Sequence, residues 1–302
     1  METKDRIDAF GAVSLTCFAA FLAFNQVVIK FVNAGIQPVF FAGLRSGVAL
    51  ICLWVWLVWR GRSPKLDRRM MVPGIAIGLV FSAEFLCLFL ALDLTTVTRS
   101  AIILYSMPVW MAIGAHFFMP GDRITWVKAA GLLLAFGGVI LAIGHRSEDA
   151  GQAGLLGDFF ALIAAICWAA LALIARGTRF REVRPEMQLY WQVLVSAPVL
   201  ILAAPLFGPL IRDLQPIHVA GVLFQGAVVV AAGFMFWLWI LSIYPASGVT
   251  SFSFLTPIFG VAFGWALLGE EVGLPLIIAV VLVAVGILLI NRPPGAKARP
   301  PA

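Results

Sequence analysis

Long apolar runs, separated by short polar segments, follow one another along almost the whole chain. A helix needs about 20 mostly apolar residues to cross the hydrocarbon core of a bilayer. Ten such runs occur, at residues 9–32, 37–59, 71–92, 97–119, 125–144, 155–175, 187–211, 217–242, 246–268 and 273–290. The pattern therefore predicts an all-α integral membrane protein with ten transmembrane helices, and it leaves no segment of domain size outside the membrane.

Composition supports this prediction and narrows the function. Of the 302 residues, 62% are hydrophobic and 12% are charged, whereas a soluble domain is about half apolar and about a quarter charged. So few charges cannot cover the surface of a soluble fold of this length. The composition argues against a soluble enzyme and a disordered chain, and no nucleic-acid partner is expected. The four cysteines and three histidines are scattered, so neither a metal site nor a cofactor is expected.

Lys and Arg are distributed unevenly between the two ends of the predicted helices. With the N-terminus placed inside, sixteen of the 21 Lys and Arg residues lie in the inner segments and four lie in the outer ones. Cytoplasmic loops of membrane proteins are enriched in these residues. Both termini are therefore predicted to be cytoplasmic, with membrane lipid around the helices.

The second half of the chain repeats the first. Residues 11–30 match residues 157–176, and Pro108 matches Pro257 at nearly the same shift. Because each half contains five predicted helices, the second half enters the membrane from the opposite side. Inverted repeats of this kind are typical of secondary transporters that work by alternating access, although a purely structural duplication is the alternative. The predicted units are residues 1–150 for the first repeat, 151–292 for the second, and 293–302 for a disordered basic tail.

The repeat also carries a resemblance to a known family. Leu22-Ala23-Phe24-Asn25, followed by Lys30, resembles the opening motif of the EamA family in the drug/metabolite transporter superfamily. Further matches are Pro108 and Pro257 and the pairs Gly121-Asp122 and Gly269-Glu270. The similarity covers both halves and is strongest, in detail, to the family's exporters of aromatic amino acids. Leu22 and Ala23 depart from the usual Trp-Gly, which leaves the substrate open.

The resemblance implies ten helices, two cytoplasmic termini and a central cavity lined mainly by the third, fourth, eighth and ninth helices. It implies a secondary transporter of a bacterial inner membrane that exports amino acids, aromatic and other apolar ones. The alternative within this class is an exporter of another metabolite or drug. The expected partners are thus a small-molecule substrate and lipid. The oligomeric state stays open, and a monomer is compatible with this reading.

Charged groups inside the membrane are the first candidates for the substrate pathway. An ionisable side chain at the centre of a transmembrane helix costs about 2.5–3.5 kcal/mol on insertion scales, so it faces the protein interior or a water-filled cavity. Glu84 can accept a substrate ammonium group or carry a proton, and Arg45 can bind a substrate carboxylate or pair with Glu84. Asn25 can offer a hydrogen bond to the pathway. For each, a polar contact between helices is the structural alternative.

Aromatic residues, a polar stripe and two prolines complete the set of candidates. Four rings near the middle of predicted helices can stack on an apolar substrate or contact lipid; they are Tyr105, Trp168, Trp237 and Trp239. Ser251 and Phe254 lie three residues apart and so share one helix face. Pro108 and Pro257 each remove a backbone hydrogen bond, and paired helix breaks in the two repeats point to a transport site.

Motifs of ATP-driven pumps and of two hydrolase classes are absent from the sequence. There is no GxxxxGK[ST], no HExxH and no GxSxG, which P-loop pumps, zinc proteases and elbow-type serine hydrolases require. The sequence thus predicts transport without enzymatic activity, and an intramembrane enzyme is the less favoured alternative.

Overall fold

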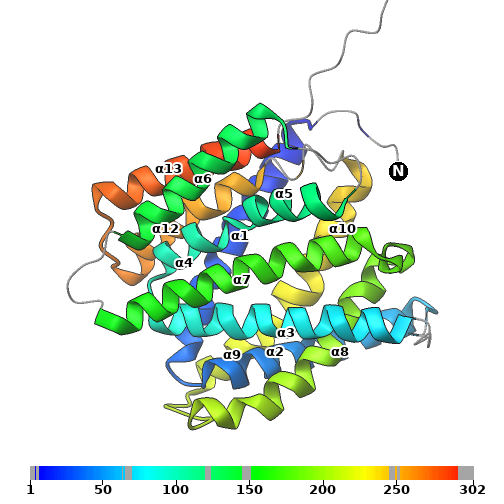
Figure 1. The fold of residues 1–302 in the computed structure, drawn as a ribbon. Coiled ribbons are helices and arrows are strands. Elements are labelled where there is room, and N and C mark those ends of the chain that lie inside the picture. The colour runs from blue at the N-terminus through cyan, green and yellow to red at the C-terminus, as the bar shows by residue number, and fades with distance from the viewer. Residues whose placement is uncertain are drawn as a thin grey trace, which may run out of the picture.

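The computed structural model consists of helices that run side by side (Figure 1). It describes residues 4, 7–62, 64, 70–119, 124–144, 151–244, 249 and 252–291, with only the backbone of 151–153. Across these ranges there is no β-strand, only a single bridge between Ile36 and Ile211.

The helices fall into two sets along the chain. The first half contains α1 (Ala9–Asn33), α2 (Pro38–Trp59), α3 (Met71–Leu94), α4 (Val97–Leu104), α5 (Met107–Phe118) and α6 (Trp126–Gly144). The second half contains α7 (Gly151–Gly177), η3 (Arg179–Glu182), α8 (Pro185–Ala203), η4 (Ala204–Phe207), α9 (Pro216–Leu223), η5 (Phe224–Ala232), α10 (Gly233–Ile243), η6 (Phe252–Phe254), α12 (Leu255–Leu268) and α13 (Leu274–Ile290).

The described helices are apolar enough for a membrane. Eight segments have the length and composition to cross a bilayer, and two shorter apolar helices cover residues 252–268 and 274–290. The prediction of an all-α membrane protein with ten apolar helices is thus confirmed. Helix α1 begins and α13 ends on the same side of the bundle (Figure 1). The Lys and Arg bias assigns this side to the cytoplasm; we call it the cytoplasmic end, and the opposite side the outer end.

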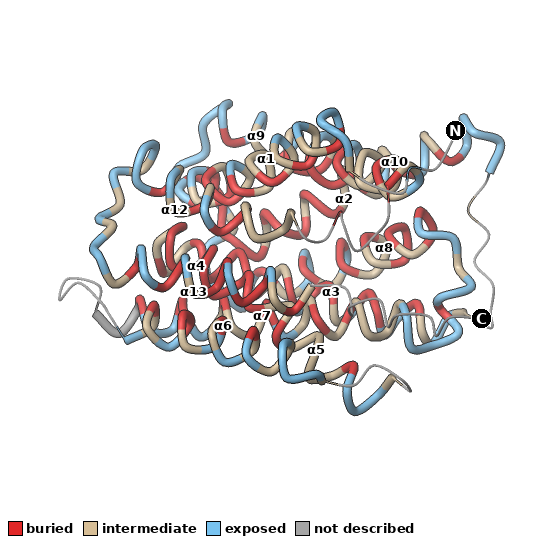
Figure 2. Tube along the Cα trace, turned by 90° about the horizontal axis from the view of Figure 1, so that it is seen from above, coloured by how far each residue is buried: buried red, intermediate tan, exposed pale blue. Residues whose placement is uncertain are grey.

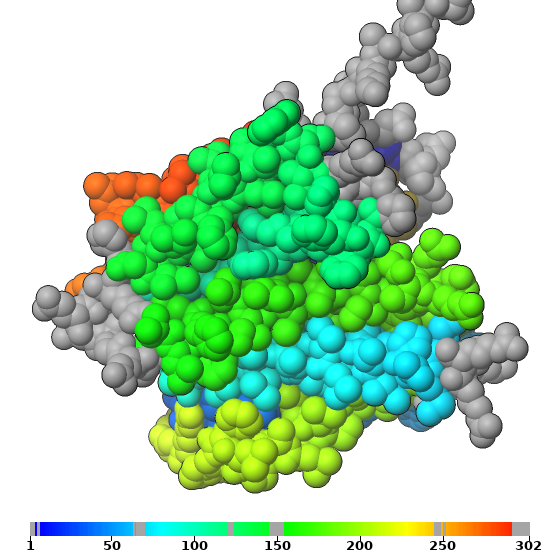
Figure 3. Space-filling view, viewed as in Figure 1, coloured from blue at the N-terminus to red at the C-terminus, as the bar shows by residue number. Residues whose placement is uncertain are grey.

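The two halves of the chain interlock instead of standing apart. The most extensive helix contacts are α6 with α13, α3 with α7, α2 with α8, α3 with α8 and α1 with α12, and each joins the first half to the second. In Figure 3 the cyan band of α3 lies between the green band of α7 and the yellow-green band of α8. Figure 2 shows the buried residues gathered where these layers meet, with the exposed residues on the outside.

Small residues let the helices of different halves approach closely. A Cβ atom on Gly286 of α13 would lie 2.6 Å from the carbonyl oxygen of Gly131 in α6, and one on Gly131 would lie 2.8 Å from that of Gly286. Side chains are therefore excluded at both positions. Such contacts are typical of helix packing in membranes, where close van der Waals contact replaces the hydrophobic effect.

Regular helix geometry is interrupted inside the membrane in both halves. Helix α4 ends at Leu104, and after the two residues Tyr105 and Ser106, α5 begins at Met107 with Pro108 in its first turn. In the second half, the short 3₁₀ turn η6 precedes α12, and Pro257 lies in the first turn of that helix. A proline there loses no helical hydrogen bond, because the first N–H groups of a helix have no partner. The eighth crossing contains the nine-residue π-helix η5, a rare form often found at functional sites.

Candidate functional site

Two charged side chains lie buried in the interior of the bundle. Arg45 of α2 and Glu84 of α3 each have 5% of their surface exposed. The charge of each acts on the other, although no nitrogen of Arg45 lies within 4.0 Å of an oxygen of Glu84. The fold thus places the two charges predicted for the pathway near each other without joining them in an ion pair.

The polar atoms of these two side chains have unused hydrogen-bonding capacity. Nε and Nη1 of Arg45 and Oε2 of Glu84 are buried and have no hydrogen-bond partner among the described residues. The guanidinium carbon of Arg45 lies 3.9 Å from the centre of the Phe85 ring and 5.5 Å from that of Phe89, where cation–π attraction holds it. Because buried polar atoms normally have partners, these donors and this acceptor suit a small polar molecule.

A second polar group lies where the π-helix meets α1 and α2. Gln225 of η5 is fully buried, and its Nε2 donates to the main-chain carbonyl of Asn25 at 3.3 Å. Oε1 of Gln225, Oε1 of Gln26 and Oδ1 of Asn25 have no partner in the described part of the chain. Gly226 packs on the turn of α2 that carries Arg45, since a Cβ there would lie 2.8 Å from the Arg45 carbonyl oxygen. Sequence reasoning missed Gln225, although an amide within a long apolar run was the available signal.

Two of the predicted aromatic residues, Tyr105 and Trp168, meet beside the break between α4 and α5. Tyr105 occupies the turn between α4 and α5, is 5% exposed, and meets Trp168 of α7 edge to face with ring centres 5.6 Å apart. Its hydroxyl group interacts with Thr256 in the first turn of α12. Phe254 of η6 is half-buried and packs against the same core. The two helix breaks are therefore linked through Tyr105 and Thr256.

The two tryptophans of α10 lie nearer the cytoplasmic end. Trp237 stacks on Phe18 of α1, with ring centres 5.7 Å apart and planes at 23°. Trp239 meets Phe10 edge to face at 6.2 Å. Both hold α10 against α1, so they are not grouped with Tyr105. Ser251 lies outside the described residues.

A cavity of about 670 Å³ opens at the cytoplasmic end. Its lining comes from the end of α2, the start of α8 and α10, and consists of Trp56, Arg60, Arg62, Glu186, Met235, Phe236, Leu238, Trp239 and Ser242. Sites for small molecules have volumes of about 300–1,000 Å³. The cavity is thus large enough for an amino acid or a somewhat larger metabolite.

One face of α2 connects this cavity to the buried charges. Arg45, Ala49, Cys52 and Trp56 recur at intervals of three and four residues, so they share a helix face. At a rise of 1.5 Å per residue, Trp56 lies about 16 Å along the axis from Arg45. Ala49 on this face is fully buried, so in this conformation side-chain packing separates the cavity from Arg45.

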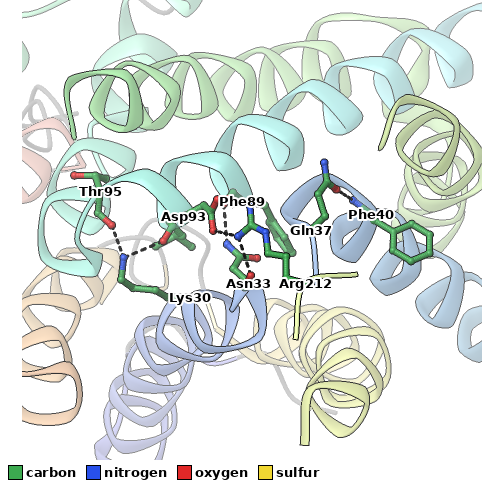
Figure 4. Close-up of polar contacts among 9 residues, drawn as sticks. Lys30, Asn33, Gln37, Phe40, Phe89, Asp93, Thr95 and Arg212 are labelled. Atoms are coloured by element: carbon green, nitrogen blue, oxygen red, sulfur yellow. Dashed lines mark hydrogen bonds and ion pairs between the residues drawn. The ribbon is translucent and has the colours of Figure 1, made fainter. Parts of the chain in front are cut away.

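The outer end of the bundle is closed by polar contacts between the two halves (Figure 4). Arg212, which precedes α9, donates to both carboxylate oxygens of Asp93 at 2.7 and 2.9 Å and to the carbonyl of Asn33 at 2.9 Å. Two main-chain hydrogen bonds join the same segments, from Gln37 N to Leu210 O at 3.0 Å and from Arg212 N to Gly35 O at 3.1 Å.

Further hydrogen bonds at the outer end tie α1 to α3 and α4 to the second half. Nζ of Lys30 donates to the carbonyls of Leu92 at 3.1 Å and Thr95 at 2.6 Å, as Figure 4 shows for Thr95. The Glu270 carboxylate accepts from the first main-chain N–H groups of α4, at 2.6 and 2.8 Å. Arg99 of α4 forms a buried ion pair with Asp158 of α7.

The described residues thus form a polar centre, with a cavity at the cytoplasmic end and polar contacts between the two halves at the outer end, where a smaller hollow of about 420 Å³ lies beside Glu270. A polar site near the midplane is typical of transporters that open alternately to each side. Among the described residues, no group of three or more metal-ligating side chains occurs.

Comparison with known proteins agrees with this reading. The EamA-like transporter family matches the chain twice, at residues 9–144 and 155–292. A probable amino-acid metabolite efflux pump of Escherichia coli (strain K12) is 26% identical over 273 residues, which cover 88% of this chain and 89% of the pump. The uncharacterized transporter YoaV of Bacillus subtilis (strain 168) is 21% identical over 92% of this chain and 94% of its own length.

Two further comparisons concern substrate and fold. An S-adenosylmethionine uptake transporter of Rickettsia bellii (strain RML369-C) is 26% identical over 60% of each chain. A solved crystal structure matches 93% of this chain and 95% of its own with a TM-score of 0.65 at 19% identity, which supports the fold alone. With both halves matched by the family and the relatives named as transporters, the chain belongs to the EamA-like transporter family, whose members are transporters and not enzymes.

Proposed function

We propose that this protein is a secondary transporter that exports amino acids, aromatic and other apolar ones, across a bacterial inner membrane. The observation that carries the proposal is the buried pair of Arg45 and Glu84, whose unpaired atoms are two nitrogens and one carboxylate oxygen. An amino acid presents a carboxylate and an ammonium group on one carbon. Arg45 binds the carboxylate, and Glu84 accepts from the ammonium group. Both interactions are charge-assisted and strong in an apolar interior.

The surroundings of the charged pair favour an apolar or aromatic side chain. The ring of Phe85 lies against Arg45, and Tyr105 and Trp168 form an aromatic pair at the helix break. Aromatic rings prefer edge-to-face and offset contacts with each other. A substrate side chain placed among these rings gains contact area without exposing a polar group. The name of the Escherichia coli relative, an amino-acid metabolite efflux pump, supports the same substrate class.

Alternating access supplies the transport step in this proposal. The contacts around Arg212 at the outer end and the cavity at the cytoplasmic end support a conformation that takes up substrate from the cytoplasm. The breaks before Pro108 and Pro257 let the outer and inner parts of their crossings move separately. Release to the outside then requires the contacts around Arg212 to open and the cytoplasmic cavity to close.

Uptake into inside-out membrane vesicles tests the proposal, because their cytoplasmic face is turned outward. Labelled phenylalanine should enter vesicles that contain the protein faster than control vesicles, and apolar amino acids should compete with it. Arg45→Gln and Glu84→Gln should each reduce uptake at least tenfold, while Arg181→Gln, an exposed cytoplasmic arginine, should not. If no amino acid enters above background, the proposal fails; entry of another metabolite class alone would overturn the substrate assignment.

A further inference from the structure

The cytoplasmic cavity contains a positive charge that the described protein does not neutralise. Arg62 and Arg184 both contact the Glu186 carboxylate, at 3.2 and 3.7 Å. Arg60, which follows the last residue of α2, has no carboxylate within ion-pair distance in the described part of the chain. Its guanidinium carbon instead lies 5.2 Å from the centre of the Trp56 ring. The positive charge of Arg60 at the mouth of the cavity is thus available to bind an anion.

The wall beside this charge is aromatic and apolar. Phe236 and Trp239 line the cavity from α10, with their ring centres 5.7 Å apart, and Trp56 lines it from α2. An arginine stacked on tryptophan retains its N–H donors at the edge of the guanidinium plane, where they can bind a carboxylate in bidentate fashion. The cavity therefore matches a molecule with a carboxylate at one end and an apolar or aromatic body at the other.

The geometry of α2 relates this cavity to the central site. Trp56 is on the helix face that carries Arg45, about 16 Å from it along the axis. Ala49 lies between them on this face and is fully buried, so a carboxylate held by Arg60 can move along the face to Arg45 only when the packing around Ala49 opens.

We propose that the cytoplasmic cavity is a capture site, in which Arg60 binds the substrate carboxylate and Trp56, Phe236 and Trp239 hold its apolar body before it reaches Arg45. This inference rests on the proposed function, because it assigns the first position at which the same substrate binds. It adds a second binding site with its own chemical requirement, the carboxylate. Loss of this site weakens capture and leaves the later steps intact.

The test compares Arg60→Gln with the matched control Arg181→Gln in inside-out vesicles. For labelled phenylalanine, Arg60→Gln should raise KM about five- to tenfold and leave the maximal rate unchanged, because it slows entry of substrate to the central site while the steps at saturating substrate stay the same. Arg60→Lys should restore part of the affinity. Added salt should raise KM of the wild-type protein more than that of Arg60→Gln, since an exposed charge is screened.

Substrate analogues separate the carboxylate from the rest of the molecule. In the wild-type protein, 3-phenylpropionate, which lacks the ammonium group, should compete with phenylalanine, and Arg60→Gln should weaken this competition. Competition by phenethylamine, which lacks the carboxylate, should not depend on Arg60. If phenethylamine and 3-phenylpropionate respond equally to Arg60→Gln, the capture site is wrong.

Two outcomes separate failure of this inference from failure of the proposed function. If the wild-type protein transports phenylalanine and Arg60→Gln keeps the wild-type KM, only the capture site is overturned. If no amino acid is transported by the wild-type protein, the proposed function fails and the capture site with it. A further assay uses the purified protein in proteoliposomes of phosphatidylglycerol or of phosphatidylcholine. If Arg60→Gln raises KM only in phosphatidylglycerol, the cavity binds a lipid headgroup, and the proposed capture of substrate is overturned.

Discussion

Arg212 and Asp93 form a bidentate ion pair that joins the second half of the chain to the first at the outer end, with N–O distances of 2.7 and 2.9 Å. The side chain of Arg212 is 38% exposed and that of Asp93 is 18% exposed. Hydrogen bonds to the Asp93 carboxylate raise the pKa of Arg212 above its ordinary value, so the guanidinium stays charged. The pair is thus a removable contact that holds the outer end shut.

Removing the Asp93 charge should favour the outward-open conformation. Asp93→Asn weakens a partly exposed ion pair that contributes about 1 kcal/mol, which corresponds to a shift of about fivefold in the conformational equilibrium. The readout is labelling of buried Cys87 by a membrane-impermeant maleimide added outside, with Cys17, Cys52 and Cys167 replaced by Ala. The labelling rate should rise severalfold.

The neighbouring residue Asp213 provides the control for the outer contact. It lies beside Arg212 in the same exposed segment, and its carboxylate is 3.5 Å from Gln215 Nε2. Asp213→Asn should leave the labelling of Cys87 unchanged. The double variant Asp93→Arg/Arg212→Asp should return labelling toward the wild-type rate; if it labels as fast as Asp93→Asn, the ion pair does not control the outer end.

The buried charges of Arg45 and Glu84 should depend on each other for stability. Neutralising one partner leaves the other charge without its nearest counter-charge in an apolar interior; because the two side chains are not in contact, the cost should be smaller than the loss of about 3–5 kcal/mol when a buried ion pair is broken. Arg45→Gln and Glu84→Gln should therefore each lower the temperature of thermal unfolding in detergent. The double variant should be more stable than either single variant, because no charge is then left alone. Additive losses would instead mean that the two side chains act independently.

The contact between α6 and α13 should tolerate no side chain at Gly286. Gly286→Val places atoms against the Gly131 carbonyl oxygen, where even a Cβ would come within 2.6 Å, so the helices must separate. Overpacking of this kind costs about 1–3 kcal/mol. Thermal unfolding should occur at a lower temperature. Gly137→Val on α6 is the matched control, since nothing lies within 4 Å of a Cβ there; equal losses in both variants would point to glycine flexibility instead.

The start of α1 should respond to acid. A hydrogen bond from Lys4, helped by one from Tyr244 and the N–H of Gly11, holds the pKa of Asp8 well below its ordinary value of 3.8. A carboxylate with a lowered pKa stabilises the folded state above its unfolded-state pKa, and this contribution is lost as the pH falls toward the lowered pKa. The difference in unfolding temperature between wild type and Asp8→Asn should be constant above about pH 5 and should shrink below about pH 4.

The membrane explains why the sequence predicted most of the fold. A bilayer dictates the length and polarity of each helix, so apolar runs such as 71–92 and 273–290 correspond closely to α3 and α13. The repeat located the prolines at equivalent crossings. Neither signal depends on contacts between distant parts of the chain.

The sequence could not predict contacts that depend on tertiary packing. Gln225 is a single amide in an apolar run, and its bond to the Asn25 carbonyl joins residues 200 positions apart. The outer contact of Arg212 likewise joins it to Asp93, 119 positions away. Local patterns carry no information on which loops meet at one end of a bundle, so these partners required the structure.

The interlocked halves have a consequence for how the protein is made. Helix α3 packs between α7 and α8, and the ion pair of Arg99 and Asp158 joins α4 to α7. A ribosome delivers the first five helices to the bilayer before their main contact surfaces exist. Biogenesis must therefore hold α3 and α4 in the membrane until the second half arrives, and a chain truncated after α6 would lack the partners that complete its packing.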